Sequence, residues 1–232
     1  METKGKTMRD SITALDSQTS AAWFPGTLSR RELRRRFWHM SPGLLPFILQ
    51  AVSHRDPISP TLRWIILGVA VAVGLRILLG FRHIQRSSES GGTAAVGGYV
   101  LCVLAMMLLF PGHLELSLAL LAILAFGDGS ATLFGLLVQG RRLPWNPQKS
   151  WSGLCAFVIV GSVMAGWIYW GETLNPEAVH PPVSFLTALQ LVVPAVVAAA
   201  VCESIDSRIN DNVRVGIAGG LVLILTHFFR PL

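Results

Sequence analysis

An acid, Asp128, lies in the middle of an apolar stretch that covers residues 114–138, and glycines precede and follow it (Gly127 and Gly129). A carboxylate within a membrane helix costs roughly 2.5–3.5 kcal/mol on insertion scales, so such a residue commonly has a function. The flanking glycines lack a side chain, which lets a backbone, an ion or a phosphate approach the acid closely. Asp128 is therefore the first candidate functional residue of the chain.

A basic loop follows this stretch and supplies groups that bind anions. It reads Arg141-Arg-Leu-Pro-Trp-Asn-Pro-Gln-Lys-Ser-Trp-Ser-Gly153 and contains Arg141, Arg142 and Lys149. If the stretch is a helix that runs toward this loop, Asp128 lies about 21 Å from the start of the helix. This places the acid in the third of the bilayer nearest the loop.

A second group of polar residues precedes the last apolar stretch. Glu203 and Asp206 share one face if the helix continues through them, and Asp211 and Asn212 follow. Carboxylates bind Mg²⁺, Mg²⁺ bridges phosphates, and Lys or Arg neutralises the remaining charge. Acids and cations on one face of a membrane are the mixture expected for a nucleotide with magnesium.

The composition is typical of a membrane protein. Of the 232 residues, 52% are hydrophobic and only 14% are charged, whereas soluble domains carry about 25% charged residues. Most of the apolar stretches reach the ~17–25 residues that a spanning helix needs. They are roughly 38–53, 62–80, 93–110, 114–138, 153–170, 184–201 and 213–229. We expect an all-α, polytopic integral membrane protein with about seven transmembrane helices.

The distribution of charge predicts how the chain is oriented. If the first stretch crosses the membrane, the basic clusters fall on one side: Arg30–Arg36, Arg82 and Arg86, Arg141, Arg142 and Lys149, Arg208 and Arg214. The positive-inside rule makes that side cytoplasmic. Residues 1–29 are then a flexible, polar cytoplasmic N-terminus, and residues 30–232 form a single membrane-embedded domain. A bacterial inner membrane would suit so compact a chain.

Other classes of function find less support. The net charge of +6 does not indicate nucleic-acid binding, because the basic residues lie in short clusters between apolar stretches and form no basic-aromatic module. Three widely spaced cysteines are expected to be buried hydrophobic residues, not a disulfide frame or zinc site: Cys102, Cys155 and Cys202. Three histidines also lack metal-ligand spacing and are expected at the membrane interface: His39, His83 and His113.

Together these motifs resemble the family of dolichol kinases, phytol kinases and CTP-dependent diacylglycerol kinases. Phe126-Gly-Asp-Gly-Ser-Ala resembles the family's GD-x-x-A helix, and the segment from Leu143 to Gly153 resembles its P/N-x-K-[ST]-x-E-G loop. Arg34-Arg-Arg-Phe-Trp-His39 is similar to the R-K-x-x-H segment before the first span. Residues 201–213 are similar to the acidic segment before the last span. The resemblance covers about residues 30–229, with Ser152 where the family loop has Glu.

The resemblance implies transfer of the γ-phosphoryl group of CTP to the hydroxyl of a membrane lipid, either an isoprenoid alcohol or diacylglycerol. In this interpretation Asp128, Asp211 and Asn212 bind Mg²⁺. Lys149, supported by Arg141 or Arg142, stabilises the transferring group. Glu203 or Asp206 accepts the hydroxyl proton, and Trp145 stacks on the cytosine. The remaining nucleotide-binding residues that it implies are Gly127, Gly129, Asn146, Pro147, Ser150 and Gly153.

Two rival functions fit parts of the sequence. The related CDP-diacylglycerol synthases share the lysine-containing loop, but their K-D…H-G-G-x-x-D-R signature is missing here, and the segment from Glu203 to Asn212 favours a kinase. A small transporter could use Asp128 to carry a proton or cation, yet the outer halves of the stretches offer few polar residues for a pathway. Each candidate residue alone also fits a structural role, so the prediction rests on their joint occurrence.

Overall fold

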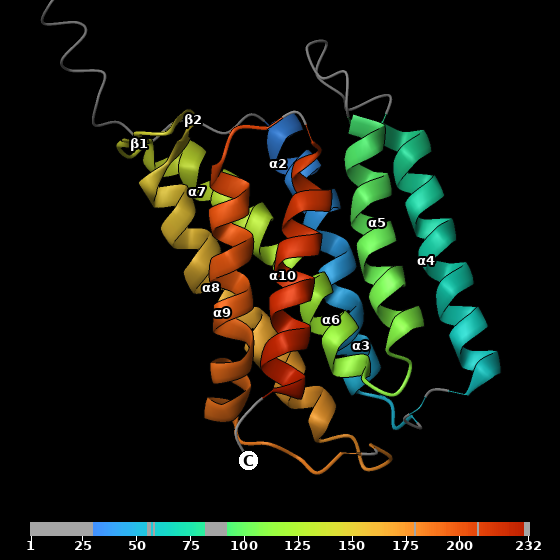
Figure 1. The fold of residues 1–232 in the computed structure, drawn as a ribbon. Coiled ribbons are helices and arrows are strands. Elements are labelled where there is room, and N and C mark those ends of the chain that lie inside the picture. Colours follow the sequence, from blue (N-terminus) through green and yellow to red (C-terminus); the bar gives the residue numbers. More distant parts are fainter. Residues whose placement is uncertain are drawn as a thin grey trace, which may run out of the picture.

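The computed structural model describes residues 30–54, 57, 59–81, 92–178, 180–207 and 209–229. The polar segment 1–29 and the arginines Arg82, Arg86 and Arg208 lie outside the described residues. The described part is a helical bundle with one short hairpin (Figure 1), which confirms the all-α prediction. Its helices are α2 (Arg30–Met40), η1 (Ser41–Leu44), α3 (Leu45–Gln50), α4 (Pro60–Phe81), α5 (Gly92–Leu109), α6 (Leu114–Ala122), η2 (Ile123–Gly127), α7 (Asp128–Val138), α8 (Trp151–Thr173), α9 (Phe185–Ser204) and α10 (Asp211–Phe228).

The helices run between two ends of the bundle, as Figure 1 shows. The hairpin end holds β1 (Arg142–Leu143), β2 (Asn146–Ser150) and the starts of α2, α8 and α10. The opposite end holds α3, the start of α6 and the last turns of α8 and α10. The basic residues of the predicted clusters that the structure describes therefore all lie at the hairpin end: Arg30–Arg36, Arg141, Arg142, Lys149 and Arg214.

Every predicted apolar stretch forms a helix or a run of consecutive helices. Three of the described helical runs are long and apolar enough to cross a membrane: Leu114–Val138, Trp151–Thr173 and Phe185–Ser204. The first stretch is divided into short helices, and Pro42 and Pro46 stand in the first turns of η1 and α3. Proline is accepted there because the first N–H groups of a helix have no intrahelical partner. The count of seven spans stays a prediction.

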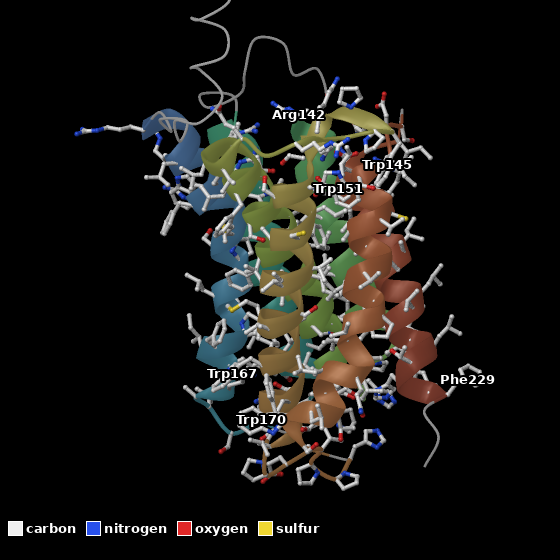
Figure 2. The ribbon with its side chains drawn as sticks, turned by 90° about the vertical axis from the view of Figure 1, so that its left-hand side faces the viewer. Arg142, Trp145, Trp151, Trp167, Trp170 and Phe229 are labelled. Carbon is white, nitrogen blue, oxygen red and sulfur yellow. The ribbon has the colours of Figure 1, made fainter. Side chains whose placement is uncertain are left out.

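α8 has the dimensions and the aromatic ends of a membrane span. Trp151 begins this helix, and Trp167 and Trp170 lie near its other end; Figure 2 shows them at opposite ends of the bundle. From Trp151 to Trp170 the helix rises about 28 Å at 1.5 Å per residue, close to the ~30 Å of bilayer hydrocarbon. Tryptophan favours both membrane–water interfaces. The positions of these rings therefore match the two surfaces of a bilayer.

The helical run that carries Asp128 passes through the core of the bundle. Every residue of α6 and η2, from Leu114 to Gly127, is buried. Residues of α5, α8, α9 and α10 join it in one hydrophobic core. On the outside, by contrast, large apolar side chains such as Ile159, Val163 and Leu221 remain exposed. A bundle that is apolar both inside and outside is suited to lipid surroundings.

Close contact between α7 and α8 fixes the position of the hairpin relative to Asp128. The Ser130 hydroxyl in α7 donates to the carbonyls of Gly127 and Ala156, at 2.9 and 3.2 Å. A Cβ atom on Gly153 would lie 2.7 Å from the backbone carbonyl oxygen of Ala131. The first turn of α8 can therefore approach α7 this closely only with glycine at this position.

Replacement of Gly153 with Ala is expected to destabilise the protein, because the new methyl group meets backbone and not a flexible side chain. Overpacking of this kind costs about 1–3 kcal/mol. Thermal unfolding in detergent measures the effect. Gly97→Ala in α5 is the matched control, since nothing lies within 4 Å of its added Cβ. Equal unfolding temperatures for the two variants would contradict the α7–α8 contact.

Candidate active site

A π-helical turn directly precedes Asp128. η2 (Ile123–Gly127) interrupts the α-helix, and Asp128 is the first residue of α7 after it. Such turns widen the helix by one residue and are frequent at functional sites. They can also leave backbone carbonyls without their regular N–H donors. The carbonyl of Gly127 accepts a hydrogen bond from the Ser130 hydroxyl. The side chain of Asp128 is largely buried, with 16% of its surface exposed.

His39 of α2 lies beside Asp128. Its Nε2 lies 3.0 Å from Oδ2 of Asp128. Close packing of α2 against α7 brings the two together: a Cβ atom on Gly129 would collide with the side chain of Met40, the residue after His39. The positive charge of Arg36 in the same helix also acts on Asp128. The absence of a side chain at Gly129 therefore lets α2 pack closely enough for His39 to reach Asp128.

The hairpin is attached to the end of α9. The indole N–H of Trp145 donates to the Ser204 hydroxyl at 3.1 Å, and the Asn146 side-chain amide donates to the Ser204 carbonyl at 3.0 Å. The side-chain oxygen of Asn146 accepts from the backbone N–H of Gln148 at 3.0 Å. These bonds hold β2 against the residue that follows Glu203. Lys149, in the same strand, is thereby directed to α9.

Lys149 lies among three carboxylates. Its ammonium donates to Glu203, which is 4% exposed, and lies 3.7 Å from Oδ2 of Asp211 at the start of α10. The charge of Asp128 acts on it as well. Burial disfavours the charged ammonium, but the carboxylates outweigh burial and hold the pKa of Lys149 above its usual 10.5. Lys149 is therefore a permanently charged cation at neutral pH.

Arg214 closes the network on the side of α10. It forms an ion pair with Asp211 and donates to the carbonyls of Cys202 and Ile205, at 2.9 and 3.0 Å. The last carbonyls of a helix have no intrahelical partner and favour a cation. Arg214 thus fixes the end of α9 to the start of α10, which sets the separation between Glu203 and Asp211.

The side chain of Tyr99, in α5, lies beside His39 at the edge of this network. The ring of Tyr99 meets that of His39 edge to face, with centroids 5.6 Å apart. Tyr99 is 7% exposed, and its hydroxyl has no hydrogen-bond partner among the described residues. A buried hydroxyl without a partner costs about 1–3 kcal/mol, which a bound polar ligand would relieve.

The structure brings together some of the predicted site residues and leaves others apart. Asp128, Lys149, Glu203 and Asp211 converge, and Asn212 is buried beside them in the chain. Five others are exposed: Arg141, Arg142, Trp145 and Pro147 in or beside the hairpin, and Asp206 after the end of α9. Arg142 donates to the carbonyl of Gln148 at 3.3 Å. The roles predicted for all these residues stay predictions.

Ser150, Ser152 and Gly153 form the start of α8. Ser150 is the N-cap residue, and its hydroxyl accepts from the backbone N–H of Gly153 at 3.2 Å. The Ser152 hydroxyl lies 3.0 Å from that of Ser150. This pairing of hydroxyls occupies the position where the resembling family has Glu. Capping by Ser150 is typical of a helix start and is worth about 1 kcal/mol.

Sequence reasoning missed the role of several residues near Asp128. His39 was expected only at the membrane interface, and Tyr99, Arg36 and Arg214 were not singled out for the site. Their contacts depend on how α2, α5 and α10 pack, which the spacing of residues does not encode. The similarity of residues 34–39 to a family motif was the one signal that marked His39.

Comparison with known proteins identifies phytol kinases as homologues. Phytol kinase 1, chloroplastic, of Arabidopsis thaliana is 27% identical over 211 residues, 85% of this chain and 67% of the relative. A probable chloroplastic phytol kinase of Triticum aestivum is 29% identical over 133 residues, 55% of this chain and 42% of the relative. Probable phytol kinase 2, chloroplastic, of Oryza sativa subsp. japonica is 22% identical over 202 residues, 83% and 65% of the two chains.

These homologues support the phytol and dolichol kinase family. No family model matches the chain, and no solved structure matches it. The aligned region spans about two thirds or less of each of these relatives. Their names place them in chloroplasts, which does not fit the bacterial inner membrane expected from the sequence. The cytoplasmic position of the N-terminus stays a prediction.

Replacement of Glu203 with Gln is expected to lower the pKa of Lys149, because burial still disfavours the ammonium while its strongest carboxylate partner is lost. Lys4, Lys6 and Lys149 are the lysines of the chain, so the measurement is simple. Acetic anhydride labelling across a pH series, followed by mass spectrometry, reports the reactive neutral amine. Labelling of Lys149 should begin at lower pH in the variant, with Lys4 and Lys6 as internal references. An identical profile in both proteins would contradict the proposed cause.

Proposed function

We propose that this chain, a homologue of the phytol kinases, transfers the γ-phosphoryl group of CTP to the hydroxyl of an isoprenoid alcohol in the membrane. The observation that carries the proposal is Lys149, which lies among Asp128, Glu203 and Asp211 at one end of an apolar bundle. That end of the bundle suits the meeting of a soluble nucleotide with a lipid acceptor. The names of the relatives favour an isoprenoid alcohol over diacylglycerol.

The residues present fit a magnesium nucleotide. Asp128 and the half-exposed Asp211 offer carboxylate oxygens near Lys149, and Asn212 adds an amide oxygen. Mg²⁺ is usually held by one or two carboxylates together with substrate phosphates and water, so a complete protein cage is not needed. When bound, Mg²⁺ would supply positive charge that offsets the negative charge of the phosphates.

The hairpin supports the proposed contact with the nucleotide base. Trp145 is 51% exposed, its indole N–H is held by Ser204, and its ring meets that of Trp151 edge to face at 5.5 Å. A ring that is exposed but fixed offers one face for stacking on cytosine. The exposed guanidinium groups of Arg141 and Arg142 belong to the same segment and would attract the phosphates from solution.

In the proposed reaction, the bond between the γ-phosphorus and its bridging oxygen breaks as the acceptor oxygen bonds to that phosphorus. CDP leaves with the electron pair, and the hydroxyl proton passes to a carboxylate. We assign this proton to Glu203 and not to Asp206, since Glu203 contacts Lys149 whereas Asp206 is exposed. Lys149 would stabilise the charge on the transferring group.

The acceptor alcohol would approach from the side of α2 and α5. His39 and Tyr99 adjoin Asp128 on that side, and the Tyr99 hydroxyl has no described partner. Exposed apolar side chains of α2, Phe37 and Trp38, directly precede His39. They offer a lipid contact beside the polar network. The hydroxyl of the lipid would then bond to Tyr99 while its chain stays in the membrane.

Label transfer from CTP tests the reaction. We expect purified protein with phytol in detergent to transfer label to lipid from γ-labelled CTP and not from α-labelled CTP, with Mg²⁺ present. Label from α-labelled CTP would indicate cytidylyl transfer and overturn the proposal. Asp128→Asn should lower turnover by about 10²–10³-fold, as for loss of a charge-stabilising group. Glu177→Gln, an exposed carboxylate at the opposite end, is the matched control and should keep wild-type turnover.

Tyr99→Phe tests the acceptor side, because it removes only the hydroxyl. Loss of one hydrogen bond of about 0.5–1.5 kcal/mol predicts a rise of about 3–10-fold in the KM for the alcohol. The KM for CTP should stay unchanged. Steady-state kinetics with each substrate varied in turn separates the two constants. Equal changes in both constants would show that Tyr99 supports the fold and not the acceptor.

A further inference from the structure

A cluster of metal-binding side chains lies at the opposite end of the bundle from Lys149. His113 precedes α6, Glu115 stands in the first turn of α6, and His227 lies in the last turn of α10. Among the described residues, these three form the group whose donor atoms all lie within 4.8 Å of one another. We propose that His113, Glu115 and His227 form a binding site for a divalent transition-metal ion of the Zn²⁺ class.

The distances between the donor atoms match a tetrahedral ion. Nδ1 of His113 lies 3.3 Å from Oε1 of Glu115 and 3.0 Å from Nε2 of His227. The third side, from Nε2 of His227 to Oε1 of Glu115, is 3.8 Å. Ligand bonds of 2.0–2.1 Å at tetrahedral angles separate donor atoms by about 3.3–3.4 Å. The three atoms therefore form one face of a coordination tetrahedron, with its fourth corner left for water.

The types of donor select the ion. Two imidazole nitrogens with one carboxylate oxygen are a common ligand set for zinc and other first-row transition metals, whereas Mg²⁺ prefers oxygen ligands alone. The proposed nucleotide site offers oxygen ligands, so the two ends of the bundle favour different ions. Glu115 is the most buried of the three side chains, with 6% exposed, and His113 is the most open, with 20% exposed. Solvent therefore reaches the cluster on the side of His113.

A second layer of contacts orients the ligands. The Tyr169 hydroxyl lies 2.7 Å from Nδ1 of His227, which leaves Nε2 of the same ring directed at the cluster. Histidine ligands commonly use the other ring nitrogen in such a hydrogen bond. Tyr169 belongs to α8 and is 1% exposed. The ring of His180 stacks on that of His113, with centroids 4.7 Å apart. These contacts hold both imidazoles in place.

The bound ion would tie the loop before α6 to the end of α10. His113 and His227 are 114 residues apart in the chain, and no disulfide links their helices. An ion that binds the folded state alone raises its stability by mass action. The tie lies at the end away from Lys149, so its loss should be separable from loss of the proposed active site.

Zinc binding by the whole chain tests the site. The protein is purified in detergent with a histidine-free tag, stripped with chelator and dialysed against Zn²⁺ with Mg²⁺ in excess. We expect one Zn²⁺ per chain by elemental analysis and a Zn²⁺-dependent rise in unfolding temperature. Co²⁺ in place of Zn²⁺ should give the visible absorption of a four-coordinate site. Wild-type protein that binds no Zn²⁺ would overturn the proposal and leave a hydrogen-bonded network only.

Variants locate the bound ion. His113→Asn and His227→Asn should each weaken Zn²⁺ binding by more than 10-fold, and Glu115→Gln keeps the side-chain shape while removing the charged ligand. Unfolding temperatures of the metal-free variants show whether they fold. Asp128→Asn should keep Zn²⁺ binding, since it lies in the other site. Wild-type affinity in all three ligand variants, or loss in Asp128→Asn alone, would overturn the assignment.

Discussion

The ion pair between Lys149 and Glu203 determines how the hairpin end is built. Glu203 is almost fully buried and Lys149 mostly so, and a buried charge without a partner is far less stable than a paired one. Loss of either side chain would therefore leave the other charge buried without this partner and destabilise the folded protein. Because Glu203 lies in the last turn of α9 and Lys149 directly precedes the start of α8, their pairing fixes the hairpin against the ends of these two helices. Asp211 and Asp128 then surround the same ammonium from α10 and α7.

The neutral contacts of the hairpin serve this pairing. Trp145 and Asn146 both donate hydrogen bonds to Ser204, one residue after Glu203. These bonds hold β2 against the end of α9. Gly153 admits α8 to within contact of the α7 backbone, which keeps Lys149 near Asp128. Trp145, Asn146 and Gly153 of the loop from Leu143 to Gly153 thus position Lys149 through their packing and hydrogen bonds. The loop supplies one charged group and the geometry that directs it.

The helices could be predicted from the sequence because long apolar stretches in a membrane have few alternatives to helix. Charge asymmetry correctly placed Asp128, Lys149, Glu203 and Asp211 in elements of the same end. The π-turn at η2 could not be predicted, since its sequence is as apolar as the α-helix before it. His113 and His227 are 114 residues apart, and their contact follows from the packing of α6 beside α10. Spacing along the chain carries no signal for such pairs.

Serine at position 152, where the resembling family has Glu, leaves Lys149 among three acids. A missing carboxylate would matter if Lys149 depended on it, but Glu203, Asp211 and Asp128 already act on that ammonium. The Ser152 hydroxyl instead adjoins that of Ser150 at the start of α8. A fourth carboxylate beside three others would add repulsion between like charges. With serine at this position, the site keeps one lysine among three acids, a net negative charge that would favour the Mg²⁺ ion of the proposed nucleotide.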